Sequence, residues 1–196
     1  MQAKFLCDQS LALLGKAITT SFSAPVQSVE RKLRRVDHLL QKLVSLMDMH
    51  SSDPYLRGRV EEVIAGSVAV RILKDLHTFG LAWSSCASLR AQAVECAGHY
   101  RAALQAYAEA ALAADSARLA VIWRIASLFA AMFAKDLPDL AKQLAHLEQA
   151  VANCSSYHPN YRHQRVIKPV LAVAKLGVRF LQPGLVFVRC MSRISR

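Results

Sequence analysis

Acidic residues are missing from the C-terminal part of this 196-residue sequence. After Glu148 there is no Asp or Glu, against eight Lys or Arg. Residues 1–50 carry seven basic and four acidic side chains, whereas 51–100 and 101–150 each carry five of both kinds. The net charge of +11 therefore lies at the two ends of the chain. This distribution suits a polyanionic partner, such as RNA, DNA or an anionic membrane, although an ordinary solvated surface is the alternative.

Glycine, proline and aromatic residues are also scarce. The sequence has 7 Gly and 6 Pro, and aromatic residues make up 7% of it. So few turn-forming residues argue against an all-β fold, and the 54% of apolar residues argues against global disorder. The length is sufficient for one well-buried domain.

The five cysteines are scattered, odd in number and without a CxxC pair, which predicts a reducing compartment rather than a disulfide framework. The N-terminal apolar stretch is interrupted by charges and lacks the pattern of a signal peptide. No stretch is expected to reach the roughly 20 apolar residues of a membrane span. The nearest, 166–188, contains Lys168, Lys175, Arg179 and a Pro183-Gly184 break. The protein is therefore predicted not to be secreted, and membrane contact is not expected.

What the sequence has in abundance is helical periodicity. In 100–134, alanine, leucine and aromatic residues recur three or four positions apart, without Gly or Pro. This pattern predicts a central helix or helix pair that is buried nearly all round. Its large residues are expected in the core: Trp123, Phe129, Met132 and Phe133.

The remaining helices follow from the same pattern and from start and stop signals. Asp53-Pro54 is an N-cap and first-turn pair, and Gly80 is a helix terminator. The predicted helices are 3–19, 25–47, 54–78, 138–153 and 170–181, together with a helix from 81, in which Gly98 allows a bend, and the central helices that continue to 134. We predict an all-α fold, a single bundle of six or seven helices around an Ala/Leu-rich central pair. Residues 1–153 would form the core domain, and 154–196 a basic loop, amphipathic helix and tail packed on it.

Motifs for catalysis are absent. The sequence contains no Walker A, GxGxxG, HExxH or GxSxG pattern. The one adjacent acidic pair, Glu61 and Glu62, is interpreted as a surface network with nearby arginines. Cys154, His158 and His163 have spacings that only weakly suggest zinc. The sequence therefore predicts no enzyme, no metal, no cofactor and no small-molecule substrate.

Two basic segments are candidates for binding RNA. In 25–47 the apolar residues form an a/d seam at 29, 33, 36, 40, 43 and 47, so the basic residues between them should face outward. The segment 155–169 alternates aromatic and basic residues, which can stack on bases and hold phosphates. In both segments the alternative is structural, a solvated helix face or a loop anchored by its tyrosines. The candidate RNA-binding residues are Arg31, Lys32, Arg34, Arg35, Tyr157, Tyr161, Arg162, His163, Arg165 and Lys168.

Two family resemblances bear on function. Gly98, Tyr100, Ala103, Leu104, Tyr107 and Ala110 resemble the second helix of a tetratricopeptide repeat, but the first-helix signature and a following repeat are missing. A helical-repeat-like protein-interaction scaffold is therefore kept as the alternative function.

The second resemblance involves 117–124, Ala-Arg-Leu-x-Val-Ile-Trp-Arg, followed by an apolar helix and Leu137 and Leu140. This segment resembles the helical core of the nucleolus and neural progenitor protein family, which is similar to the small helical subunit of fungal ribonuclease MRP. The resemblance implies a non-catalytic ribonucleoprotein subunit that acts in RNA processing, ribosomal RNA in that family. It implies partner protein subunits bound through apolar helices and a nuclear, nucleolar location. The cytoplasm and the mitochondrial matrix remain alternatives.

Overall fold

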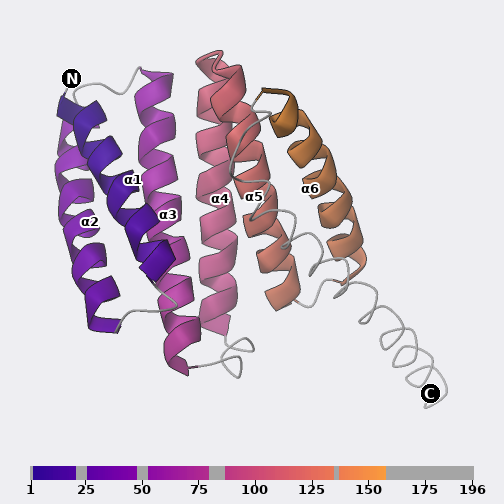
Figure 1. Ribbon diagram of the computed structural model, residues 1–196, viewed down its shortest axis with the longest axis horizontal. Coiled ribbons are helices and arrows are strands. Elements are labelled where there is room, and N and C mark those ends of the chain that lie inside the picture. The colour runs from indigo at the N-terminus through magenta and orange to yellow at the C-terminus, as the bar shows by residue number, and fades with distance from the viewer. Residues whose placement is uncertain (1, 21–25, 48–52, 80–86, 135–136, 158–196) are drawn as a thin grey trace.

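Six helices form the described part of the chain in a computed structural model (Figure 1). The structure describes residues 2–20, 26–47, 53–79, 87–134 and 137–157. Within them every regular element is a helix, which confirms the predicted all-α bundle. The helices are α1 (Gln2–Thr20), α2 (Val26–Met47), α3 (Pro54–Phe79), α4 (Ala87–Glu109), α5 (Ala113–Ala134) and α6 (Leu137–Tyr157). The predicted helix 170–181 lies outside the described residues.

The helices form a bundle of three that continues as a row. α1, α2 and α3 pack against one another around one apolar cluster that includes Leu14, Val36, Leu43 and Val63. α4 then packs on α3, α5 on α4, and α6 on α5, as Figure 1 shows from left to right. α3 and α4 therefore occupy the middle of the molecule, whereas α2 and α6 lie at opposite ends.

α3 and α4 are in close contact at Gly58, because the ring of Tyr107 from α4 packs against this glycine of α3. A Cβ placed on Gly58 would lie 2.6 Å from Cδ1 of the Tyr107 ring. The ring of Tyr107 also stacks on Tyr55, with centroids 5.9 Å apart. Glycine at this position is thus required by the space that the Tyr107 ring occupies.

The break between α4 and α5 contains neither glycine nor proline. Ala111 has a left-handed φ of 56°, and the N–H of Leu112 donates to the carbonyl of Tyr107 at 3.0 Å. The N–H of Ala111 donates to the carbonyl of Ala108. These are the two hydrogen bonds of a Schellman cap, which normally has glycine at the left-handed position. The sequence left a single helix and a helix pair open, and the structure has the pair.

Local capping at Asp53 agrees with the prediction. The N–H of Tyr55 donates to Oδ1 of Asp53 at 2.9 Å, which places the start of α3 at Pro54. Gly98, where the sequence allowed a bend, lies inside α4, which runs without interruption from Ala87 to Glu109. The proposed helix start at 81 lies outside the described residues. In α2 the buried stripe includes Leu39, while Leu40 is only partly buried, because two neighbouring helices demand a wider stripe than an a/d seam.

The prediction that 100–134 is buried nearly all round is wrong for α5. Phe129 and Met132 are each 45% exposed, and Trp123 and Phe133 are only partly buried. The reason is that α5 packs on α4 at one side and α6 at the other. α3 also contacts α5, since Val68 and Ile122 belong to one apolar cluster, but an open groove remains between the two helices.

The helix predicted to end at 153 is longer in the structure. α6 runs through Asn153 to Tyr157, and Cys154 is buried among α5 and α6 side chains. Residues 154–157 therefore belong to the helical core rather than to a loop. Residues 158–196 lie outside the described part of the chain.

Candidate functional site

The outer face of α2 is a basic stripe. Its apolar side chains Val29, Leu33, Val36 and Leu43 are turned into the three-helix bundle. The exposed side of the helix then carries its basic residues, as the helical period requires. The exposed basic residues are Arg31, Arg34, Arg35 and Lys42, with His38 between them. Lys32 lies at the edge of this stripe, partly buried and 3.4 Å from Oγ of Ser28.

The two acidic residues of α2 do not neutralise the stripe, because both pair with α3. Asp37 accepts from Nη2 of Arg71 at 2.6 Å. Glu30 lies 3.7 Å from Nζ of Lys74. Within the described residues, Arg31, Arg34 and Arg35 take part in no ion pair. The packing of α2 on α3 therefore leaves these three arginines exposed on the outside of the bundle.

Of the candidate residues in the predicted aromatic and basic loop, only Tyr157 lies within the described residues. Tyr157 ends α6 with 55% of its surface exposed, but it is helical rather than part of a loop that starts at 155. Tyr161, Arg162, His163, Arg165 and Lys168 lie outside the described residues. Because α2 and α6 are at opposite ends of the row, the structure does not bring Tyr157 together with the arginines of α2 (Figure 1).

A buried charge cluster at the centre of the bundle was missed by the sequence interpretation. Glu62 is 6% exposed and accepts hydrogen bonds from Arg118, at 2.7 and 3.1 Å, and from the Tyr107 hydroxyl at 2.8 Å. Arg59 lies 3.7 Å from the same carboxylate and also pairs with Asp8 of α1. The network thus joins α1, α3, α4 and α5.

The predicted surface network of Glu61 and Glu62 is therefore wrong. Glu61 contacts Nδ1 of His99 on α4 at 2.7 Å, Glu62 is held by Tyr107 and Arg118, and Arg57 pairs with Glu109 instead of Glu61. Among the described ion pairs of Glu61 and Glu62, only the i,i+3 contact of Arg59 with Glu62 lies within α3. The spacing along α3 could not reveal this, because the partners are more than 30 positions away in sequence.

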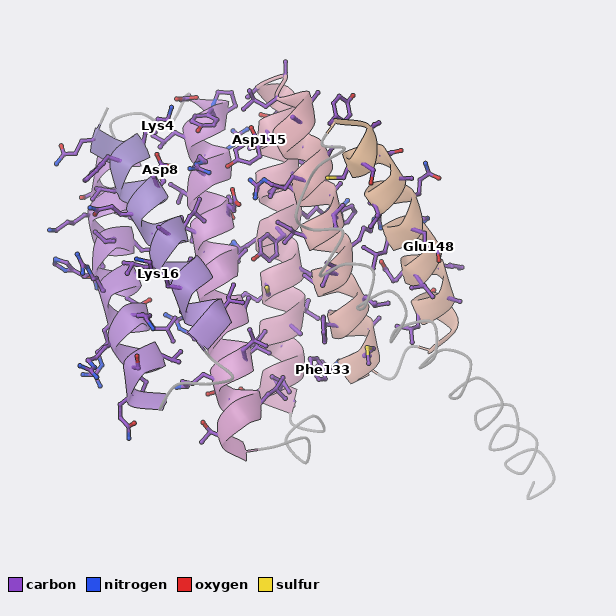
Figure 2. All side chains as sticks on the ribbon, viewed as in Figure 1. Lys4, Asp8, Lys16, Asp115, Phe133 and Glu148 are labelled. Atoms are coloured by element: carbon purple, nitrogen blue, oxygen red, sulfur yellow. The ribbon has the colours of Figure 1, made fainter. Side chains whose placement is uncertain are left out.

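A cavity of about 480 Å³ lies over this cluster, between α1 and α5. Asp8 and Asp115 line it near the upper end of the bundle in Figure 2, and Arg59, Glu62 and Arg118 line its floor. Burial, and then the nearby Glu62 carboxylate, raises the pKa of Tyr107, so this phenol keeps its proton. Burial likewise raises the pKa of the Cys7 thiol to about 11. The site therefore holds charges in mutual pairs and presents no activated nucleophile among these two groups.

An apolar groove of about 220 Å³ adjoins the polar cavity on the same side of α4. Tyr100 and Ile122 line both. Its walls are α3 and α5, and small side chains such as Ala69, Ala93 and Ala126 make it open. Phe133, at the lower end of α5 in Figure 2, lines its far end. The groove is thus a continuous apolar surface that reaches solvent.

α5 is long and apolar enough to cross a bilayer, with a mean hydropathy of 1.6 over an 18-residue window of which 28% is buried. The expectation that no stretch reaches a membrane-spanning composition is therefore wrong for Ala113–Ala134. The core helix of a folded domain can have the same length and hydropathy. Here Arg118 of α5 binds Glu62 of α3, and Val121 and Leu128 pack on α6.

Metal-binding clusters are absent from the described residues, and Cys154 is buried with a pKa that burial raises. His158 and His163 lie outside that part. Comparisons with family models, curated proteins and solved structures found no match for this chain. The resemblance to the nucleolus and neural progenitor protein family therefore stays a prediction.

Proposed function

We propose that this protein is a non-catalytic helical subunit of a ribonucleoprotein, and that it binds RNA phosphates through the outer face of α2. The observation that supports this proposal is the arrangement of charge on α2. Its acids are paired with α3, whereas Arg31, Arg34 and Arg35 take part in no ion pair within the described residues. The planar guanidinium group of arginine can donate two parallel hydrogen bonds to phosphate oxygens. Three arginines within two helical turns can therefore contact phosphates along one RNA strand.

The proposed contact positions RNA without reading its sequence. Arg31 to Lys42 span about 16 Å along the helix at 1.5 Å per residue. Side chains on such a straight stripe reach backbone phosphates, which carry no base information. The RNA-processing role, with ribosomal RNA as the substrate, and the nucleolar location rest on the family resemblance and belong to the same proposal.

The salt dependence of RNA binding tests the proposal. In the triple variant Arg31→Gln, Arg34→Gln, Arg35→Gln, RNA should bind more weakly at low salt. The slope of log Kd against log salt should become shallower by roughly 2, at about 0.7 per lost phosphate contact on a single strand. Fluorescence anisotropy with a labelled single-stranded RNA measures both quantities.

A matched variant controls for net charge. Lys4→Gln, Arg90→Gln, Lys142→Gln removes the same charge from exposed positions on α1, α4 and α6. This control should keep the parent's slope within about half a unit, since these side chains are spread over three helices. Equal slopes for the parent and the α2 variant would reject the proposal.

The apolar groove favours a second candidate function, a scaffold for another protein subunit. Its lining comes almost wholly from Ala, Ile, Leu and Phe side chains of α3, α4 and α5. A groove of this kind accepts the apolar face of an amphipathic helix. Phe129→Ser should then prevent co-purification of a partner subunit while RNA binding by the isolated chain is unchanged. Loss of RNA binding in that variant would instead tie the groove to the RNA site.

A further inference from the structure

The seam between α4 and α5 brings two guanidinium groups onto one indole ring. Cζ of Arg124 lies 3.9 Å from the ring centre of Trp123, which is the distance of a stacked contact. Cζ of Arg101, from the neighbouring helix, lies 6.0 Å from the same ring centre. The packing of α4 on α5 brings Arg101 to this ring, because Arg101 is on α4 and the other two residues are on α5.

Among the described residues, neither arginine has an acidic partner. The side chains three and four positions away along the two helices are uncharged: Ala97, Gly98, Leu104 and Gln105 on α4, and Ala120, Val121, Ser127 and Leu128 on α5. Within the described residues, no ion pair or hydrogen bond involves the side chain of Arg101 or Arg124. Burial and the nearby Arg101 charge both lower the pKa of Arg124. Two like charges are therefore held close together without compensation.

Stacking on Trp123 leaves the hydrogen-bonding capacity of Arg124 available. A guanidinium group that stacks on a ring uses its flat face, whereas its five N–H donors point outward in its plane. Arg101 is exposed on the surface, and Arg124 is half-buried beside it. Two guanidinium groups that reach solvent therefore lie within 6.0 Å of the centre of one indole ring.

We propose that Arg101, Trp123 and Arg124 form a binding site for a phosphate group. A phosphate supplies the negative charge that relieves the repulsion between the two arginines, and several acceptor oxygens for their donors. The phosphate can belong to an RNA strand or to a free nucleotide. In the first case this site rests on the proposed RNA function as a contact separate from the α2 stripe. In the second case it does not.

The fluorescence of Trp123 provides a direct test. The chain has 2 Trp, so the full-length Trp83→Phe protein reports on Trp123 alone. It is titrated with inorganic phosphate, with a nucleoside monophosphate and with a short single-stranded RNA. We expect a saturable change in emission. Arg101→Gln or Arg124→Gln should weaken the response about 10- to 100-fold, the effect of losing one charge-assisted hydrogen bond.

The controls separate this site from general charge effects. Arg90→Gln removes an exposed arginine from the same helix α4 and should leave the midpoint unchanged. Arg124→Lys, which keeps the charge but loses the planar fork, should bind more weakly than the parent. If circular dichroism shows that Arg124→Gln loses helical content, Arg101→Gln decides the question, because Arg101 is exposed. Equal weakening by Arg90→Gln and Arg101→Gln would overturn the proposal.

The three probes distinguish the sources of the phosphate. A response to RNA that persists at saturation in the Arg31, Arg34, Arg35 triple variant supports the site as an RNA contact. A response to phosphate and nucleotide without one to RNA supports the site for a free nucleotide, whatever the outcome for α2. RNA binding seen by anisotropy with no change at Trp123 for any probe would overturn this site and leave the α2 proposal intact.

Discussion

The first three helices and the last three differ in how they treat charge and apolar surface. In α1–α3 the apolar side chains converge on one core, and the acids of α2 pair across the interface with α3. In α4–α6 the helices lie in a row, and α5 keeps Phe129 and Met132 at the surface. A helix whose neighbours leave part of its surface open cannot bury an all-round apolar sequence. α2 thus presents a charged outer face, whereas α5 presents an apolar one.

The two halves are held together by contacts of α3 with α4 and α5. The Glu62 cluster and the Gly58–Tyr107 contact both cross from α3 to α4 or α5. Each of these contacts depends on precise placement of its groups, through hydrogen-bond geometry in one case and the absence of a Cβ in the other. Substitutions at this junction should therefore cost more than substitutions at either exterior.

The largest effect is expected at the buried charge cluster. Arg118→Ala leaves the Glu62 carboxylate in a buried site without its bidentate partner, so the free energy of unfolding should fall by about 3–5 kcal/mol. Arg57→Ala, which breaks the exposed pair with Glu109, should cost about 0–1 kcal/mol. Urea unfolding followed by circular dichroism measures both. Similar losses in the two variants would contradict the central role of the cluster.

A core substitution compares the two halves directly. Leu43 is 0% exposed in the α1–α3 core, and Leu43→Ala should cost about 2–5 kcal/mol. Met132 is 45% exposed on α5, and Met132→Ala should change stability by less than about 1 kcal/mol. The two deletions remove side chains of similar size. Thermal unfolding that ranks Met132→Ala as the more damaging would show that α5 is covered in solution.

Glycine-to-alanine changes test the close contact of α3 with α4. The added methyl in Gly58→Ala meets the Tyr107 ring, so we expect a loss of about 1–3 kcal/mol from overpacking. Gly98→Ala in α4 meets nothing within 4 Å and should stabilise by about 0.5–1 kcal/mol through helix propensity. Chemical denaturation gives both signs. A neutral Gly58→Ala would mean that the Tyr107 ring moves aside easily.

The pH dependence of stability sharpens the same comparison. Burial and Glu62 raise the pKa of Tyr107 in the folded state, so folding stabilisation from the neutral phenol is present below the unfolded pKa of about 10. It is lost as the pH rises above that value. Tyr107→Phe should cost about 1–2 kcal/mol at neutral pH and make the decline above about pH 10 shallower. Denaturation midpoints between neutral and alkaline pH measure the slope. An unchanged slope would assign the decline to Tyr100 and the buried thiols instead.

The smallest effect is expected at the turn between α4 and α5. Ala111 has a left-handed φ of 56°, a conformation that costs a residue with a Cβ about 1 kcal/mol relative to glycine. Ala111→Gly should therefore raise the free energy of unfolding by up to about 1 kcal/mol. Ala110→Gly, one position earlier, should not stabilise. Thermal midpoints of the two variants test the cap geometry, and a destabilised Ala111→Gly would contradict it.

The residues that sequence reasoning placed well are those whose role depends on near neighbours. The capping of α3 by Asp53 and the outward position of Arg31, Arg34 and Arg35 follow from contacts within four positions. The turn at Ala111 could not be found, because no glycine or proline marks it. Glu62 was assigned to the surface, because a charged residue on a helix is usually solvated and its partners lie far away in sequence.

By itself, the sequence determined the helical class, most helix positions and the basic stripe on α2, because helical periodicity and capping are local. The tertiary structure alone decided which acids pair with which arginines, and hence which positive charges remain outside. It also decided that α5 stays half-covered and that Arg101 meets Arg124 on Trp123. These outcomes depend on how many neighbours each helix has and on its rotation toward them, which the order of residues along one helix does not encode.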